Sequence, residues 1–176
     1  SKAIPNASLH IYGAYAKPKH LAMTNEKDRF YVHGFVDNAQ AVIESSRVML
    51  APLQFGAGLK GKIFDALLNG TPCVMSSIAA EGIFGPDQPN GFIDDDNQKF
   101  IDHAIDLYTN NTSWEQFQNN GFEVLKKRFN SKLFIEKLFC KMDYLHKNLE
   151  AHRLQNFTGI LLQHHSMQST KYLSKW

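Results

Sequence analysis

Residues 48–69 read VMLAPLQFGAGLKGKIFDALLN, so that a short apolar run, a glycine-rich turn and a helical pattern follow one another directly. The apolar run at 48–52 predicts a buried strand, and the pattern at 60–69 predicts a helix. Glycines let the backbone approach a ligand closely, and the first amides of a helix attract anions. Because Lys60 and Lys62 add positive charge, the segment predicts a site for an anion such as a diphosphate. A purely structural turn with exposed lysines is the alternative.

Short apolar runs also lie on both sides of this segment, and each leads into a turn or a helical pattern. Strands are predicted over 9–13, 30–34, 72–75 and 91–93, and a further helix over 38–46. Strands that alternate with helices indicate an α/β layered fold with a parallel sheet. Strands of continuous apolar residues suit a sheet that helices cover on both faces.

Beyond residue 96 the apolar residues recur at helical spacing, which predicts three helices after the sheet. We expect Ser113 or Thr112 to cap the second helix and the third helix to begin at Ser131. The apolar stripe of the third helix is interpreted as a core-packing face, and it consists of Leu133, Phe134, Leu138, Phe139, Met142 and Leu145. The predicted organisation is one domain over 1–150 and a basic, partly helical tail over 151–176.

Composition is that of an ordinary globular protein, with 43% hydrophobic and 20% charged residues among 176. The charge is uneven: residues 1–125 carry nine basic against 14 acidic side chains, and residues 126–176 carry ten against three. A basic end favours anionic lipid or nucleic acid, or simply a solvated helix face. The start of the chain has no signal-peptide pattern, so we expect a cytoplasmic protein. Cys73 and Cys140 are expected to be buried free thiols in a reducing compartment.

Two anion-binding motifs compete at the glycine-rich turn. Gly56, Gly61 and Lys62 match the spacing of a Walker A loop, but Ile63 stands where the Mg²⁺-binding hydroxyl belongs. This argues against an NTPase. The turn also spells Gly-x-Gly-x-x-Gly, and an acidic residue follows 20 positions after its last glycine. That fingerprint normally follows the first strand, whereas two strands are predicted before this one. A NAD-dependent oxidoreductase domain therefore stays the weaker alternative.

A third interpretation comes from a family resemblance. Residues 51–67 (APLQFGAGLKGKIFDAL) resemble the donor loop and following helix of the group 1 glycosyltransferases, which have the GT-B fold. Residues 69–74 (NGTPCV) are similar to the next turn and strand of that family, and residues 78–83 (IAAEGI) to the loop after it. The resemblance covers residues 8–110. It implies a Rossmann-like parallel sheet followed by C-terminal helices, in a domain that binds the donor for sugar transfer from a nucleoside diphosphate sugar to an acceptor hydroxyl.

The resemblance also implies which residues form the site. The turn and its first lysine would hold the donor diphosphate, through Gly56, Ala57, Gly58, Leu59 and Lys60. Asp65 would bind the ribose hydroxyls, a sound role for a carboxylate that accepts two hydrogen bonds. The base would lie beside Gly34, Phe35 and Val36. Lys62 and Glu81 would be catalytic. Many relatives have a sugar-binding Glu at the position of Ala57, so Glu81 is the substitute candidate here, although it is equally typical of a loop carboxylate.

The resemblance further implies that parts of the family's structure are missing. In the family, a strand and a helix precede the segment similar to residues 9–13, and a separate N-terminal domain binds the acceptor. We therefore expect a sheet that lacks its first strand and helix, and a chain that is inactive without the N-terminal domain. The missing strand would lie in the middle of the sheet. Its gap is predicted to close by direct re-pairing, by another chain, or by dimerisation through the exposed edge.

No metal or other cofactor is expected. The residues Asp94, Asp95 and Asp96 imitate a metal-binding motif, but they precede a helix and are interpreted as its cap. His164 and His165 have no nearby partner at ligand spacing. Lysines and helix amides would supply the positive charge that a diphosphate leaving group needs. The expected partners are the donor and the missing domain, with peripheral membrane contact through the basic tail and without nucleic acid. A non-catalytic interaction module that uses this tail is a second alternative.

Overall fold

The computed structural model describes residues 4–162 and residue 173. Contacts divide the chain into two compact units, which meet in the sequence between Phe129 and Asn130. The predicted limit at residue 150 falls inside the second unit. Each unit is described by itself below.

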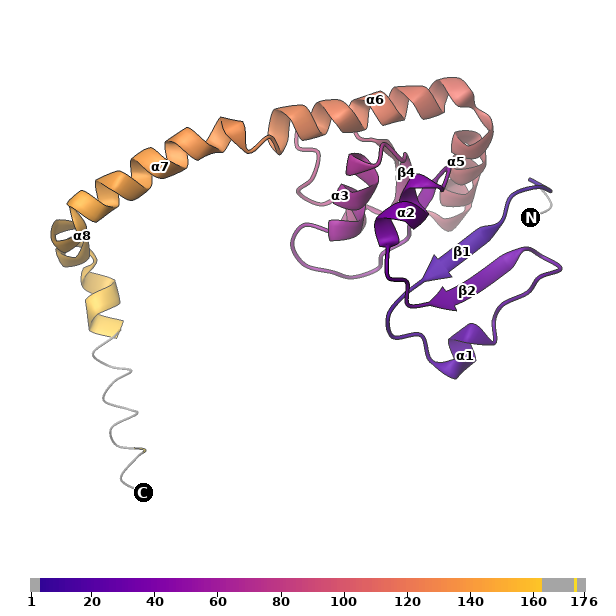
Figure 1. Cartoon of the computed structure of the whole chain (residues 1–176), viewed down its shortest axis with the longest axis horizontal. Coiled ribbons are helices and arrows are strands. Elements are labelled where there is room, and N and C mark those ends of the chain that lie inside the picture. Colours follow the sequence, from indigo (N-terminus) through magenta and orange to yellow (C-terminus); the bar gives the residue numbers. More distant parts are fainter. Residues whose placement is uncertain (1–3, 163–172, 174–176) are drawn as a thin grey trace. The chain divides into compact units, whose positions relative to one another are not determined.

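Among the described residues, the first unit is an α/β structure whose five strands form two parallel sheets. Figure 1 shows the smaller of these sheets in indigo and purple. Strands β1 (Leu9–Tyr12) and β2 (Phe30–Gly34) lie side by side in one sheet, whereas β3 (Met49–Ala51), β4 (Cys73–Met75) and β5 (Gly91–Ile93) form the other in that order. The predicted α/β fold with parallel strands is confirmed, and all five strands lie within the stretches where the sequence predicts them.

The two sheets of this unit are not joined, since β1 and β3 do not pair in the described part of the chain. The outer edge of β2 is covered, because the amide of Val32 donates to the Thr24 hydroxyl at 3.0 Å and Phe30 exchanges backbone hydrogen bonds with Asn25. The edge of β1 that faces away from β2 has no such hydrogen bonds among the described residues. The structure thus lacks the direct re-pairing that was one of the expected ways to close the gap, and the other two stay predictions.

Six helices accompany these strands. They are α1 (Pro18–Leu21), α2 (Ala39–Glu44), α3 (Gly61–Leu68), α4 (Ser77–Ala80), α5 (Asn97–Thr109) and α6 (Asn111–Arg128). Helix α6 runs alongside both α3 and α5 (Figure 1). The cap predicted for α6 is wrong: the side chain of Asn110 caps this helix by accepting from the amide of Ser113 at 3.2 Å. Asn caps as well as Ser does, and Asn110 is already needed to end α5.

The core of the first unit lies between β4 and the helices that cover it. Its fully buried side chains come from α3, β4, the segment after α4, and α6, and they include Ile63, Leu67, Cys73, Met75, Ile83 and Val124. Because the apolar side of α3 is sealed against this core, the turn that leads into α3 is held at one place on the surface.

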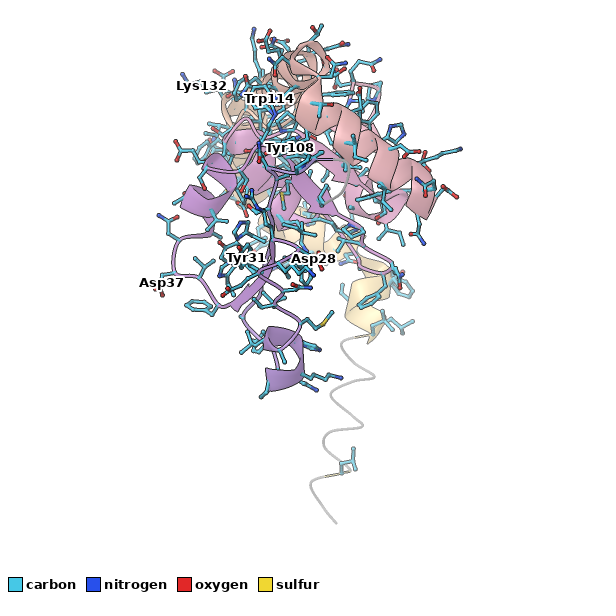
Figure 2. The ribbon with its side chains drawn as sticks, turned by 90° about the vertical axis from the view of Figure 1, so that its right-hand side faces the viewer. Asp28, Tyr31, Asp37, Tyr108, Trp114 and Lys132 are labelled. Carbon is cyan, nitrogen blue, oxygen red and sulfur yellow. The ribbon has the colours of Figure 1, made fainter. Side chains whose placement is uncertain are left out.

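A cluster around Arg47 anchors the chain just before β3. The guanidinium Nε of Arg47 donates to the carbonyl of Tyr108 at 2.6 Å, and the indole of Trp114 donates to the carbonyl of Arg47 at 2.7 Å. Figure 2 marks Tyr108 and Trp114, which come from α5 and α6. These bonds tie the start of β3 to the two helices and so fix the strand from which the glycine-rich turn emerges.

The second unit is helical, with α7 (Lys132–Lys147), α8 (Leu149–Gln155) and a further turn of helix over residues 157–162. The apolar stripe of α7 is exposed, with Phe134 at 53% and Leu138 at 57%. The core-packing interpretation of this stripe is therefore wrong for the described residues, because this unit has no second element packed along α7. No helix that the structure describes is long and apolar enough to span a membrane. His164 and His165 lie outside the described residues.

The two cysteines differ in their surroundings. Cys73 is buried in β4, where desolvation raises the pKa of its thiol to about 12, and a hydrogen bond with Asn90 opposes the rise. Cys140 is exposed on α7, so the expectation of a buried thiol is wrong there. The reason is that nothing in the described part of this unit covers α7, whose apolar side chains are exposed as well.

We expect a thiol reagent such as dithionitrobenzoate to modify Cys140 of the native protein quickly at pH 8, because the reactive thiolate must be accessible to the reagent. Cys73 should react only in urea. A Cys140→Ser variant is the control, and it should show no fast reaction. Two fast thiols in the wild type would contradict the burial of Cys73.

Candidate functional site

The glycine–lysine turn, residues 56–62, leaves the carboxyl end of β3 and enters α3. Gly58 has a φ of 67°, in the left-handed region that favours glycine. Residues 56–59 are all exposed. In parallel sheets, ligands bind beyond the carboxyl ends of the strands, so the turn stands where such a fold places its ligands.

The main-chain amides of this turn have no protein partner in the part of the chain that the structure describes. Within the described residues, none of the amides from Gly56 to Lys62 donates to another protein group, whereas the next amide, of Ile63, donates to the carbonyl of Lys60 at 2.9 Å. A run of unpaired N–H groups at the start of a helix attracts an anion, since each amide can donate to one of its oxygens and the helix dipole adds to the attraction. The turn therefore has the donors that a diphosphate needs.

Lys60 is buried beneath the turn, although lysines are seldom buried. Its ammonium donates to the carbonyl of Gly58 at 2.7 Å and to the carboxylate of Glu81 at 3.1 Å. The side chain of Lys60 is 6% exposed and that of Glu81 is 65% exposed. The structure thus brings together two of the residues that the sequence assigned to the site, in an ion pair that the sequence did not indicate.

Lys62 and Asp65 lie three residues apart on α3, which places both side chains on one face of the helix. Lys62 is exposed and Asp65 is half-buried. Neither forms an ion pair with any residue of the described chain. A free cation and a free carboxylate therefore stand next to the unpaired amides, while the opposite face of α3 is buried in the core.

Residues 34–36 lie at the carboxyl end of β2, which ends at Gly34 in the other sheet. Gly34 is buried with a φ of 79°, and its carbonyl accepts from the amide of Gly13 at 2.6 Å. The ring of Phe35 is 67% exposed, and Val36 is half-buried. In the described part of the chain, no hydrogen bond or ring contact connects these three residues to the turn, so their place in the site stays a prediction.

The acidic triplet before α5 serves the ends of helices. The Asp96 carboxylate accepts from the amides of Gln98 and Lys99, both at 3.0 Å, and so caps α5 as predicted. Hydrogen bonds from the hydroxyl and the amide of Ser77 hold the pKa of Asp95 below its ordinary value. Three or more His, Cys, Asp or Glu side chains do not converge on a point anywhere in the described chain.

Comparison with known proteins identifies the family of this chain. The family model for "Glycosyl transferases group 1" matches residues 1–110. An uncharacterized 44.6 kDa protein in the cps region of Klebsiella pneumoniae is 26% identical over 103 residues, which are 58% of this chain and 26% of that protein. This chain thus spans about a quarter of the curated relative that it matches.

Two solved structures have a similar fold. One is a mutant of S. aureus TarM in complex with fondaparinux, alpha-GlcNAc-glycerol and UDP, with a TM-score of 0.65 and 18% identity over 78% of this chain and 29% of that chain. Another is TarM, with a TM-score of 0.62 and 19% identity over the same shares. The likeness agrees with the predicted C-terminal half of the GT-B fold, which is confirmed as the fold class.

Proposed function

We propose that this chain, which belongs to the group 1 glycosyltransferases, binds the nucleoside diphosphate part of a sugar donor at its glycine–lysine turn. The observation that carries the proposal is the run of amides from Gly56 to Lys62, which leads into α3 and has no protein partner among the described residues. A diphosphate is the part of such a donor that amides and a lysine bind best.

Each group at the turn has a defined part in this proposal. The amides and the ammonium of Lys62 bind the two phosphates and stabilise their charge as the glycosidic bond breaks, so no metal is needed at that step. Asp65 accepts hydrogen bonds from the ribose hydroxyls. Glu81 uses one oxygen for Lys60, and since its side chain is 65% exposed, its second oxygen is available to a hydroxyl of the donor sugar. Phe35 offers an exposed ring to the base.

Transfer of the sugar to an acceptor hydroxyl is proposed for a longer assembly. This chain spans 29% of the solved structures that it resembles, and an acceptor site is not assigned to any of its described residues. We therefore propose that the chain supplies donor binding, that a further domain supplies the acceptor, and that the chain alone does not catalyse transfer. Membrane contact through the basic residues after 126 stays a separate prediction.

A thermal-shift titration of the full chain tests donor binding. UDP is the first probe because one of the similar structures holds UDP, and GDP, UMP and NAD complete the set. A ligand at about 100 times its Kd stabilises the native state by about 2.7 kcal/mol, which raises the melting temperature measurably. We expect UDP or GDP to raise it more than UMP, which lacks the second phosphate. A shift with NAD alone would favour an oxidoreductase, and no shift with either diphosphate would refute the proposal.

A further inference from the structure

We infer that Lys60 is a positioning residue, whose buried ammonium ties Gly58 to Glu81 and holds the glycine–lysine turn in the shape that binds a diphosphate. This inference rests on the proposed function for the identity of the ligand, whereas the contacts of Lys60 with Gly58 and Glu81 do not depend on it. It changes the expected role of Lys60, which the family resemblance implied to be a direct ligand of the diphosphate.

The burial of Lys60 is the first argument. A buried ammonium is costly unless hydrogen bonds and an opposite charge compensate it. Lys60 has both, through the carbonyl of Gly58 at 2.7 Å and the carboxylate of Glu81 at 3.1 Å. With its side chain 6% exposed, the ammonium would have to break these bonds to meet an outside anion. Lys62 is exposed and has no ion-pair partner in the described chain, so it can meet the anion without such a loss.

The bond to Gly58 explains how Lys60 shapes the turn. In a planar trans peptide, the carbonyl of one residue and the amide of the next point in opposite directions. Because the Gly58 carbonyl points to the buried ammonium, the amide of Leu59 must point away from it. The carbon stem of Lys60 also lies under Gly56, where an added Cβ would come within 3.1 Å of Lys60 Cε. Lys60 therefore supports the turn at two of its glycines.

Glu81 supplies the fixed side of this connection. It ends α4, and the next residue, Gly82, touches the turn as well, since a Cβ on Gly82 would lie 3.1 Å from Leu59 Cδ2. Arg128 in turn donates to the carbonyl of Gly82 at 3.4 Å. Segment 81–82 is thus linked to the turn by the ion pair and lies close to Leu59, and Arg128 ties it to the end of α6. Glu81 then acts on the diphosphate through Lys60.

The experiment measures UDP affinity of the full chain by calorimetry in wild type, Lys60→Met, Glu81→Gln and the double variant. We expect each single change to weaken UDP binding about tenfold, and the double variant to bind no more weakly than Lys60→Met, because both residues act as one unit. Lys62→Met should also weaken binding and should lower its dependence on salt, which the other changes leave as it is. Lys99→Met, an exposed lysine on α5, is the matched control and should bind as wild type does.

Two results would overturn the inference. Tighter UDP binding by Glu81→Gln would mean that its carboxylate merely repels the anion. Effects that multiply in the double variant would mean that the two residues contact UDP independently. Glu81 is 65% exposed, and Gln keeps a side-chain oxygen that can accept from the Lys60 ammonium, so Glu81→Gln should leave the fold intact even if Lys60→Met unfolds.

A second readout without ligand separates this inference from the proposed function. Chymotrypsin can cleave after Phe55, which is 86% exposed at the edge of the turn, and after Tyr15, which is 94% exposed elsewhere. Loss of the Lys60–Glu81 connection should speed cleavage after Phe55 about tenfold and leave cleavage after Tyr15 unchanged. If wild type binds neither UDP nor GDP and this pattern still holds, the proposed function fails and the positioning role stands. Unchanged cleavage after Phe55 in both variants would refute the positioning role.

Discussion

Replacing Asp65 by alanine is expected to weaken UDP binding by about 100-fold, because two hydrogen bonds from ribose hydroxyls to a carboxylate are lost together. The carboxylate of Asp65 is half-buried on α3 and has no ion-pair partner in the described chain, so it is free to accept both. Calorimetry with UDP measures the loss directly. The effect should exceed that of any single change at the turn, where several amides share the diphosphate.

A comparison of UDP with 2′-deoxy-UDP makes this test specific for the ribose. Wild type should prefer UDP, and Asp65→Ala should bind both nucleotides with similar affinity, because the group that distinguishes them is gone. Glu115→Ala, which removes an exposed acidic side chain from α6, is the control and should keep the preference. If Asp65→Ala still prefers UDP as strongly as wild type does, the ribose is bound elsewhere and the assignment of Asp65 is wrong.

Strand β4 could be predicted from sequence because a fully buried strand appears there as a short run of apolar residues. All three residues of β4 are 0% exposed, and a sheet strand covered on both sides has no polar alternation to confuse the pattern. The turn into α3 was equally clear, since glycines and a helical pattern follow a strand directly. Here local sequence and tertiary structure agree, which is typical of an element whose surroundings are set by the core.

The role of Lys60 could not be predicted in the same way. A lysine in a glycine-rich turn is expected to be exposed, and its partner Glu81 lies 21 positions later in the sequence. Only the packing of α4 beside the turn brings the two together. The structure therefore changes the expected roles of some predicted site residues. Lys60 and Glu81 pair with each other, whereas Lys62 and Asp65 on α3 have no ion-pair partner among the described residues.

The start of α6 and the surroundings of α7 could not be predicted from sequence for a different reason. Ser, Thr and Asn cap helices almost equally well, so a run that contains all three around residues 110–113 does not specify where α6 begins. In α7 the spacing of apolar residues predicts an amphipathic helix correctly, but spacing alone cannot say what covers its apolar stripe. In the described part of the second unit this stripe is exposed.

The largest loss of stability is expected for Leu67→Ala, at about 2–5 kcal/mol in urea unfolding. Leu67 is 0% exposed in the core beneath α3. Helix α6 packs closely over it, since a Cβ added at Gly121 would lie 3.1 Å from Leu67 Cδ2, so the cavity left by truncation has little room to collapse. Its neighbour Leu68 is 60% exposed, and Leu68→Ala should cost at most about 0.5 kcal/mol.

The pair Leu67 and Leu68 also tests how α3 serves the site. Lys62 and Asp65 project from the same helix whose apolar face contains Leu67. If the core alone orients this helix, Leu67→Ala should weaken UDP binding as well as stability, even at temperatures where the protein stays folded, whereas Leu68→Ala should change neither. At the carboxyl end of α3, the carbonyl of Gly70 accepts from the side-chain amide of Gln118 at 2.8 Å. Lower stability with unchanged UDP affinity would show that this contact and the turn at the other end of α3 suffice to hold the site. Similar losses of stability in both variants would contradict the burial difference on which the prediction depends.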